Sequence, residues 1–455
     1  MDETDWSSFR KYAERVRSIQ IRGREARVPA LVKQTFTASF ERYPSDQPVI
    51  FPNLTEFDWR ETTFLSLDDS GVPLFKYFAG PTVTIITLSC IRSQVPPASE
   101  LAILSDLPNL CPNVTSFTVF FSYAWNYDPS RQVGEMASQW KRLRSLRSCA
   151  ISQSDMDKLA SQGTLQTLGI EITTSSPIYV GRVPDTVQEL LLSPWDTTLC
   201  TRYLQNIHGS PTICRLFIGM NHVDEAEIEA LFQLLPLCLD TSRLQRLTIQ
   251  PRSVFVRTRL SEIPKLRTTF LPSLVQFSSL RELDMDVFCT SQVNDAEYAR
   301  MAQSLPYLRH LKVGTAKLSS VIRPYPVATV VAVIGVVTYC PHLETLCIPF
   351  DGRLLPPFSV TQSLFSSDTM CRELQGDGEP WESESSAVTY LGDVVKGWGM
   401  PNKRITKLHV GNSPVADAAI GILASCFKSL LPGLKQIQHH GLDERWDAVQ
   451  HILTS

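Results

Sequence analysis

The segment Cys340-Pro341-His342-Leu343-Glu344-Thr345-Leu346-Cys347-Ile348 contains a proline followed by apolar residues at relative positions 1, 4 and 6. The same pattern recurs along the whole chain, mostly at spacings of about 20 to 36 residues, which is typical of a solenoid built from stacked repeats. Counted by their first apolar residue, the repeats begin at Val16, Leu54, Val83, Val114, Leu146, Leu165, Val187, Ile213, Leu244, Leu280, Leu308, Leu343, Ile405 and Leu434.

Each repeat is predicted to contain one short strand. Residues at positions 4 and 6 of a strand point to the same side, and position 5 points to the other. Leu346 and Ile348 are therefore expected to be buried, and Cys347 is expected to face out. The apolar segment 326–339 is predicted to be a helix from its place in the repeat, although its Val and Ile content is also typical of a buried strand.

A single strand and a single helix cannot bury a shared core, so the repeats must stack. Helices are about 10 Å across and strands lie about 4.8 Å apart, so the stack is expected to bend with the helices outside. The sequence therefore predicts an α/β fold. It is a leucine-rich-repeat-like solenoid, or horseshoe, with a concave parallel β-sheet and outer helices.

The composition excludes some classes of protein. The chain has 455 residues, 43% of them hydrophobic and 20% charged, with a net charge of -3. A general nucleic-acid or anionic-membrane binder normally carries a basic excess, so neither partner is expected. The longest apolar run, Val327 to Val337, is too short to cross about 30 Å of hydrocarbon. We expect a single solenoid over residues 1–455 in the cytoplasm or the nucleus.

The 11 cysteines include no C-x-x-C pair, and several fall at predicted core positions. Reduced, buried thiols are the interpretation that this pattern favours. The segments 53–55 and 113–115 match the N-x-T glycosylation pattern, but each stands at the start of a predicted strand and no secretory signal precedes it. We interpret both matches as a coincidence of the repeat.

The N-terminal segment 5–19 has an amphipathic pattern. Trp6, Phe9, Tyr12 and Ala13 share one helical face, and Val16 follows directly. This W-x-x-F-x-x-Y-A-x-R-V-R-S-I stretch, followed by P-x-L-x-x-L-x-L repeats, resembles the leucine-rich-repeat region of the F-box proteins of mushroom-forming fungi. The resemblance covers nearly the entire chain. It implies that the repeats hold a protein substrate, while an F-box docks the adaptor of a cullin-RING ubiquitin ligase.

The sequence departs from this family at its start, because it begins where the F-box would have ended. Only the substrate-binding role is therefore carried over, and a ligase adaptor is expected as a partner only if an F-box is encoded upstream. One alternative is a ligase-independent leucine-rich-repeat scaffold or binding protein. An enzyme with a dispersed site is another.

The remaining elements follow from periodicity and spacing. The repeat rhythm breaks between Ile348 and Ile405, which predicts an irregular insertion over residues 351–404. Its polar, acidic part near residues 373–386 is predicted to be a mobile loop. Residues 441–455 are predicted to cap the last repeat. Further helices are predicted over residues 27–43, 99–107, 131–141, 154–161 and 224–235.

A search for catalytic and cofactor motifs finds none. The sequence lacks G-x-G-x-x-G, a Walker loop, H-E-x-x-H and G-x-S-x-G, so no catalytic residue, cofactor or metal ligand is predicted, and the chain is not expected to be an enzyme. His409, His439 and His440 could approach one another, but a metal site needs a further ligand. The basic segment 140–147 contains Trp140, and we favour a solvated surface over an anion site there.

The strongest candidate site is the concave face, which positions 3, 5 and 7 of each repeat should line. Three carboxylates on one strand lie between basic residues of its neighbours. One interpretation is a ladder of exposed ion pairs, and the other is a cradle for a basic segment of a partner protein. Apolar side chains such as Ile85 are expected elsewhere on the face, where they could anchor a partner. The candidate protein-binding residues are Arg246, Glu282, Asp284, Asp286, His310, Lys312, Phe120 and Phe217.

Overall fold

The computed structural model describes most of the chain. The described residues are 3–22, 38, 49–60, 78–90, 105–121, 130–174, 176, 183–207, 212–221, 225–252, 265–266, 268–286, 290–314, 326–353, 401–440 and 443–455. The acidic segment 373–386, most of the insertion around it and nearly all of the predicted helix 27–43 lie outside the described residues.

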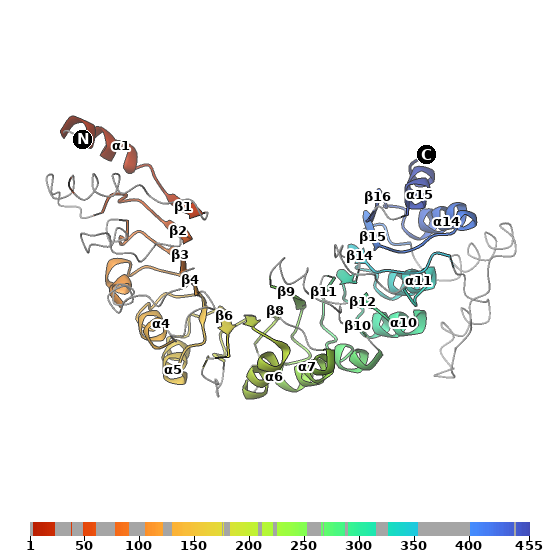
Figure 1. Ribbon diagram of the computed structural model, residues 1–455, viewed down its shortest axis with the longest axis horizontal. Helices are drawn as coiled ribbons and strands as arrows, with labels where there is room; N and C mark the ends of the chain where they lie inside the picture. The colour runs from red at the N-terminus through yellow and green to blue at the C-terminus, as the bar shows by residue number, and fades with distance from the viewer. Residues whose placement is uncertain are drawn as a thin grey trace. The chain divides into compact units, whose positions relative to one another are not determined.

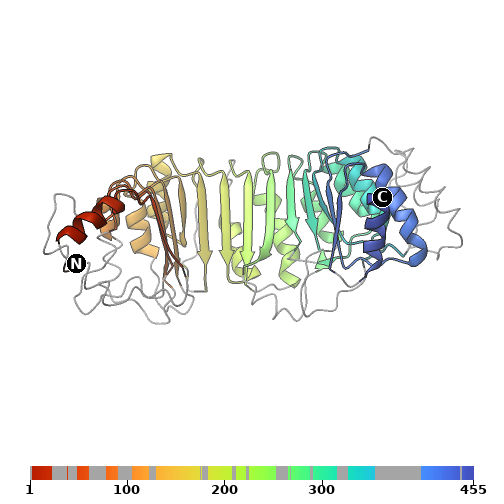
Figure 2. The ribbon, with the colours of Figure 1, turned by 90° about the horizontal axis from the view of Figure 1, so that it is seen from above.

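Parallel strands in chain order form the main sheet of the described part, which has 14 strands. A second, two-stranded sheet pairs β10 (Lys265–Leu266) with β12 (Thr290–Ser291). Figure 2 shows the strands of the main sheet running in one direction. These strands are β1 (Ser18–Arg22), β2 (Glu56–Arg60), β3 (Ile85–Cys90), β4 (Ser116–Phe121), β5 (Ser145–Cys149), β6 (Thr167–Ile172), β7 (Glu189–Pro194), β8 (Arg215–Met220), β9 (Arg246–Pro251), β11 (Glu282–Met285), β13 (His310–Val313), β14 (Thr345–Cys347), β15 (Lys407–Gly411) and β16 (Gln436–His439).

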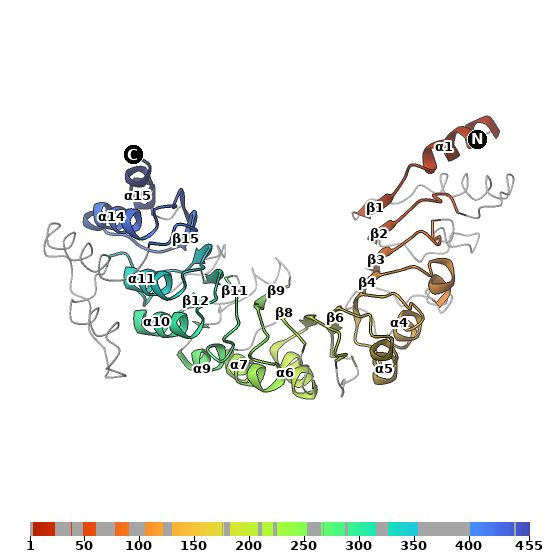
Figure 3. The same ribbon diagram turned by 180° about the vertical axis from the view of Figure 1, so that it is seen from behind.

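The helices lie on one side of the strands (Figure 1). The view from behind shows the same arrangement (Figure 3). The helices are α1 (Glu3–Ala13), α4 (Ser130–Ala137), α5 (Gln153–Gln162), α6 (Thr197–Asn206), α7 (Glu225–Cys238), α9 (Leu271–Leu274), α10 (Asp295–Ser304), α11 (Val330–Tyr339), α14 (Ile420–Leu430) and α15 (Arg445–Thr454).

The chain divides into two compact units. The first comprises Met1–Trp195 with Gln205–Thr212, and the second comprises Asp196–Leu204 with Ile213–Ser455. Strands β1 to β7 belong to the first unit, and the remaining strands of the main sheet belong to the second. In both units a strand alternates with a segment that returns the chain to the next parallel strand. The predicted fold class, an α/β leucine-rich-repeat-like solenoid, is confirmed.

The core consists of the residues at positions 1, 4 and 6 of each repeat, as the periodicity predicts. Leu343, Leu346 and Ile348 are fully buried, and most of their counterparts in the other described repeats are buried as well, whereas Val16, Ile19 and Leu434 in the first and last repeats are half-buried. The position 4 set is Phe57, Ile86, Phe117, Leu146, Leu168, Leu190, Leu216, Leu247, Leu283, Leu311, Leu346, Leu408 and Ile437.

One repeat boundary was predicted wrongly. Leu146 pairs with Leu168, which stands at position 4, so its repeat begins three residues earlier, at the buried Leu143. The error has a simple cause. Counting from Leu146 puts the apolar Cys149 and Ile151 at positions 4 and 6, whereas the correct register puts a serine at position 6.

Hydrogen bonds join successive repeats where each strand begins. The amides of Glu344 and Thr345 both donate to the carbonyl oxygen of Arg309, at 2.7 and 3.0 Å. Side chains add to this ladder, because Asn113 Nδ2 donates to the carbonyl oxygen of Pro81 at 2.8 Å. The asparagine of the other glycosylation-like match, Asn53, makes the same kind of bond to Glu14, at 2.8 Å. Both asparagines therefore have a structural role in the repeat.

Helix α11 is confirmed but begins at Val330, four residues after the predicted start. Thr329 is its N-cap, and Asp295 at the start of α10 accepts hydrogen bonds from Thr329 N at 2.7 Å, Thr329 Oγ1 at 2.8 Å and Ala332 N at 3.1 Å. Residues from Val330 to Val337 are buried around the whole helix, because α10 and α14 both contact it. This burial explains why the segment is apolar on every face.

The terminal helices α1 and α15 each place an aromatic side chain against the neighbouring repeats. In α1, Phe9 lies 6.2 Å from the ring of Phe51, but Tyr12 is 65% exposed and stacks under Arg15. Of the residues that the sequence places on one helical face, Ala13 is therefore buried while Tyr12 is exposed. In α15, Trp446 is buried, and its Nε1 donates to the carbonyl oxygen of Ser413 at 2.8 Å.

Candidate protein-binding face

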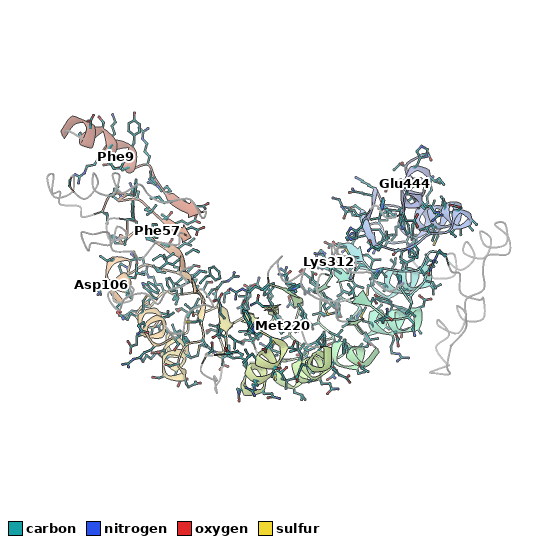
Figure 4. The ribbon with its side chains drawn as sticks, in the orientation of Figure 1. Phe9, Phe57, Asp106, Met220, Lys312 and Glu444 are labelled. Carbon is teal, nitrogen blue, oxygen red and sulfur yellow. The ribbon has the colours of Figure 1, made fainter. Side chains whose placement is uncertain are left out.

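The candidate site lies on the open face of the second unit, which we define as the side of the sheet that carries positions 3, 5 and 7. Glu282 of β11 pairs in register with Arg246 of β9 and His310 of β13. Asp284 pairs with Lys312 on one side, as the repeat count predicts. In Figure 4, Lys312 lies on the side of the strands opposite α10 and α11. We call Arg246, Glu282, Asp284, Asp286, His310 and Lys312 the central band.

Glu282 and Asp284 of the central band form ion pairs with basic side chains on the neighbouring strands. Arg246 Nη2 lies 3.0 Å from Glu282 Oε1, and Lys312 Nζ lies 3.1 Å from Asp284 Oδ2. Burial alone lowers the pKa of Lys312, but the charge and hydrogen bond of Asp284 outweigh that effect, so the pKa is raised and the lysine stays charged. Such partly exposed pairs stabilise a fold by only about 0 to 1 kcal/mol each.

The other members of the band are held by local hydrogen bonds. Asp284 Oδ1 also accepts from the backbone amide of Asp286, at 3.3 Å. His310 Nδ1 lies 3.0 Å from Thr345 Oγ1 on the next strand. These contacts match the ion-pair ladder that the sequence allowed. A basic partner segment would have to replace Arg246 or Lys312 as the counter-ion of a carboxylate.

Two small side chains near the band are buried despite their place on the open face. Thr248 pairs in register with Phe217 and Asp284, and it is 7% exposed. Cys347 follows Lys312 in the same row and is also 7% exposed. The prediction that Cys347 points away from the core is correct in direction, but the side chain is not solvated, because longer neighbours flank it.

Cys347 is not an activated nucleophile. Burial, followed by the negative charges of Asp286 and Asp284, raises the pKa of its thiol to about 12, although Lys312 acts in the opposite direction. The reactive form of cysteine is the thiolate, which this environment disfavours at neutral pH. Cys111, Cys149, Cys200, Cys214, Cys238, Cys340, Cys347 and Cys426 are free thiols.

The two candidate aromatic residues lie in different units. Phe217 of β8 is half-buried, and a Cβ added at Gly219 would lie 3.0 Å from its Cε1, so the ring leans across the glycine. Phe120 of β4 is also half-buried and pairs in register with Ser89. Ile85 is 39% exposed in the neighbouring strand. Phe217 therefore extends the face of the second unit, whereas Phe120 belongs to that of the first.

His409, His439 and His440 make separate contacts in the structure. The rings of His409 and His440 are 5.0 Å apart and nearly perpendicular, whereas His439 Nε2 lies 3.0 Å from Asp447 Oδ1. Among the residues that the structure describes, no three histidine, cysteine or carboxylate side chains are grouped closely enough to hold a metal ion.

The aromatic residue of the basic segment 140–147 is a core residue. Trp140 is 1% exposed, its ring centroid lies 5.0 Å from that of Phe117, and its Nε1 donates to the carbonyl oxygen of Cys111 at 2.9 Å. The indole is therefore not available to stack on a ligand. The solvated-surface interpretation applies to the neighbouring Lys141 and Arg142, which are exposed.

The charged and polar residues predicted from the sequence came from three strands, β9, β11 and β13, although the same register continues across β14 and β15. Thr345 pairs with His310, and His409 pairs with Cys347, so both belong to the open face of the second unit. The position 3 and position 5 rule would have identified them.

No described helix is long and apolar enough to cross a membrane.

No family model matches the sequence, and no curated protein matches it. The solved structures that are similar to it at low identity include the following two. An internalin (inlF) from Listeria monocytogenes has 12% identity and a TM-score of 0.32, with 94% of this chain and 88% of the internalin covered. A chain in the structure of the Rad7 and Elc1 complex in yeast has 14% identity and a TM-score of 0.37, with 95% and 93% covered.

Proposed function

We propose that this chain is a protein-interaction solenoid that binds its partner through the open face of the second unit. The observation that supports the proposal is the ordered row of charged and polar side chains on β9, β11 and β13. Their backbones are held in register, and Glu282, Asp284, His310 and Lys312 are each partly exposed. A surface of this kind offers fixed hydrogen-bonding groups to an extended protein segment.

The partner is proposed to carry basic side chains. Glu282 and Asp284 already pair with Arg246 and Lys312 in the central band, so a lysine or arginine of a partner would take the place of either cation as the counter-ion of its carboxylate. The half-buried ring of Phe217 beside Thr248 gives the same face an apolar contact. Aromatic side chains in such positions are frequent anchors of interfaces.

The finer proposal is that this solenoid is the substrate-recognition part of an F-box subunit of a cullin-RING ubiquitin ligase. It rests on the resemblance of the N-terminal segment and of the repeats to that family. The alternative is a scaffold that works without a ligase. Purification of the natural gene product with its partner distinguishes the two, because the ligase adaptor should be present only in the first case.

Charge reversal tests the binding face. In the variant Glu282→Lys, Asp284→Lys, Asp286→Lys, we expect the affinity for a labelled peptide that alternates lysine with threonine to fall by about tenfold or more, since attraction becomes repulsion. The matched control Glu229→Lys, Asp417→Lys, Glu444→Lys makes the same change in net charge away from the face. Its affinity should stay within about twofold of the parent.

Thermal melting of both variants is measured alongside, because the reversal breaks two ion pairs. The double variant Arg246→Glu, Glu282→Arg keeps this ion pair but exchanges the positions of its two charges. It therefore separates the effect of losing the ion pair from the effect of losing the binding site. If the reversed variant folds and binds the basic peptide like the parent, the central band is not the binding site.

A further inference from the structure

A second charged surface lies at the edge of the second unit where its strands begin. The residue directly after the first apolar residue of a repeat donates its amide to the repeat before it. Arg281 N donates to Gln245 O, Arg309 N to Arg281 O, and Glu344 N to Arg309 O, each at 2.7 Å. Lys435 N donates in the same way to Thr406 O, at 2.9 Å. These side chains therefore stand side by side along one edge.

This edge is strongly basic although the chain as a whole has a net charge of -3. We consider the six repeats that contain β9, β11, β13, β14, β15 and β16. In each repeat we take the two residues before the first apolar residue and the one residue after it. Glu344 is the only acidic residue at these positions. The basic residues at these positions are all exposed. We define them as the basic rim: Arg243, Arg281, Arg309, Lys403, Arg404 and Lys435.

Most of the rim is not neutralised by the protein itself. Arg243 Nε lies 3.6 Å from Asp240 Oδ2, and Arg309 Nη1 lies 4.0 Å from Glu344 Oε1. Within the described part of the chain, the other four side chains have no carboxylate within ion-pair distance. Arg281 and Arg309 follow one another directly, so two like charges are held on adjacent strands, where they repel.

We propose that the basic rim binds an acidic segment of a partner protein, with the segment running across the strand starts. Carboxylate side chains would neutralise the rim and relieve the repulsion between Arg281 and Arg309. Six strands at about 4.8 Å spacing make the rim about 24 Å long, which corresponds to about seven residues of extended chain. Arginine also pairs with carboxylates in a two-pronged geometry that favours this ligand.

A nucleic acid fits the rim less well than an acidic peptide does. Single-stranded nucleic acids bind to repeated aromatic platforms as well as to cations. Among the described rim positions, Tyr307 is the only phenylalanine, tyrosine or tryptophan that is exposed. The rim shares no residue with the central band, so the two surfaces can be tested independently.

The probe is a short labelled peptide that alternates glutamate with threonine, and the same peptide with glutamine is the uncharged control. We expect the acidic peptide alone to bind, with an affinity that falls as salt is raised. In the variant Arg281→Glu, Arg309→Glu, Lys435→Glu, binding should weaken by about tenfold or more. The matched control Arg202→Glu, Arg300→Glu, Lys428→Glu places the same charge change on helices of the same unit, and it should bind like the parent.

Melting curves of both triple variants establish that they are folded. Equal weakening in the two variants would mean that net charge, and not the rim, attracts the peptide, and would overturn the proposal. Tighter binding of an oligouridine RNA than of the acidic peptide would also overturn it, in favour of a nucleic-acid site. The central-band reversal Glu282→Lys, Asp284→Lys, Asp286→Lys leaves all rim residues in place and should retain the acidic peptide.

Discussion

Leu346 shows how one residue of the repeat supports its neighbours. It is fully buried at position 4 of β14, in register with Leu311 and Leu408 on the strands to either side. The substitution Leu346→Asp places a charge in this shared core, so we expect the free energy of unfolding to fall by about 4 kcal/mol or more. Chemical denaturation of the variant measures the loss.

Glu344 is the control for this prediction, because its side chain is 40% exposed and lies 4.0 Å from Arg309. Glu344→Lys should change the unfolding free energy by only about 0.5 kcal/mol. If Leu346→Asp is tolerated as well as Glu344→Lys, the assignment of inward and outward positions is wrong.

Period-2 alternation predicts at the residue scale which side of the sheet a residue occupies. It correctly placed Leu346 inward and aligned Glu282 with Arg246 and His310. It could not predict that Cys347 is buried on the open face. That burial depends on whether longer side chains from the adjacent strands cover the short cysteine side chain. Alternation also could not predict which residue each carboxylate pairs with, since each carboxylate has a neighbouring strand on either side.

At the scale of single elements, the contact between α10 and α11 depends on one carboxylate. Burial raises the pKa of Asp295, although the hydrogen bonds from Thr329 and Ala332 oppose this effect. A carboxyl group with a raised pKa binds its proton more tightly in the folded state than in the unfolded state. The group therefore contributes stability that is present at low pH and is lost as pH rises through the folded-state pKa.

The comparison of the parent with Asp295→Asn isolates this contribution from the other titrating groups. As pH falls from neutral towards the folded-state pKa of Asp295, the difference in unfolding free energy should shift in favour of the parent. Urea denaturation at a series of pH values measures that difference. A difference that is constant across the series would show that Asp295 does not titrate differently on folding.

Helices were predicted well where a second signal accompanied the hydrophobic pattern. The predicted segment 154–161 matches α5, which has Ser152 as its N-cap and Gly163 in the left-handed conformation at its end. Helix α7 extends to Cys238, past the predicted end at residue 235, although Pro236 lies inside it. Helix α4 ends at Ala137, because the chain must then turn to bury Trp140. Tertiary packing of this kind is not visible in a local pattern.

At the scale of the whole molecule, the repeat itself made the fold predictable. Each strand pairs with its neighbours in chain order, so a local pattern determines most of the long-range topology. The function was less predictable, because the repeat pattern does not restrict which residues occupy positions 3 and 5, and these positions form the candidate binding face. The basic rim went unnoticed because overall net charge averages over two edges of a sheet, whereas binding depends on one edge.

The same architecture predicts how damage to the core spreads. Contacts in a solenoid are mainly between neighbouring repeats, so a cavity should weaken the strands around it more than distant ones. Leu168 of β6 in the first unit and Leu311 of β13 in the second are both fully buried at position 4. Replacing either by alanine should cost about 2 to 5 kcal/mol of local stability.

Hydrogen exchange measured by mass spectrometry can locate the effect of each substitution. Leu168→Ala should accelerate exchange most in β5, β6 and β7, and Leu311→Ala should do so most in β11, β13 and β14, because these strands are hydrogen-bonded neighbours of the altered ones. Each variant is the control for the other. If both substitutions accelerate exchange equally in all of these strands, the chain unfolds as one cooperative block, and nearest-neighbour contacts do not determine its stability.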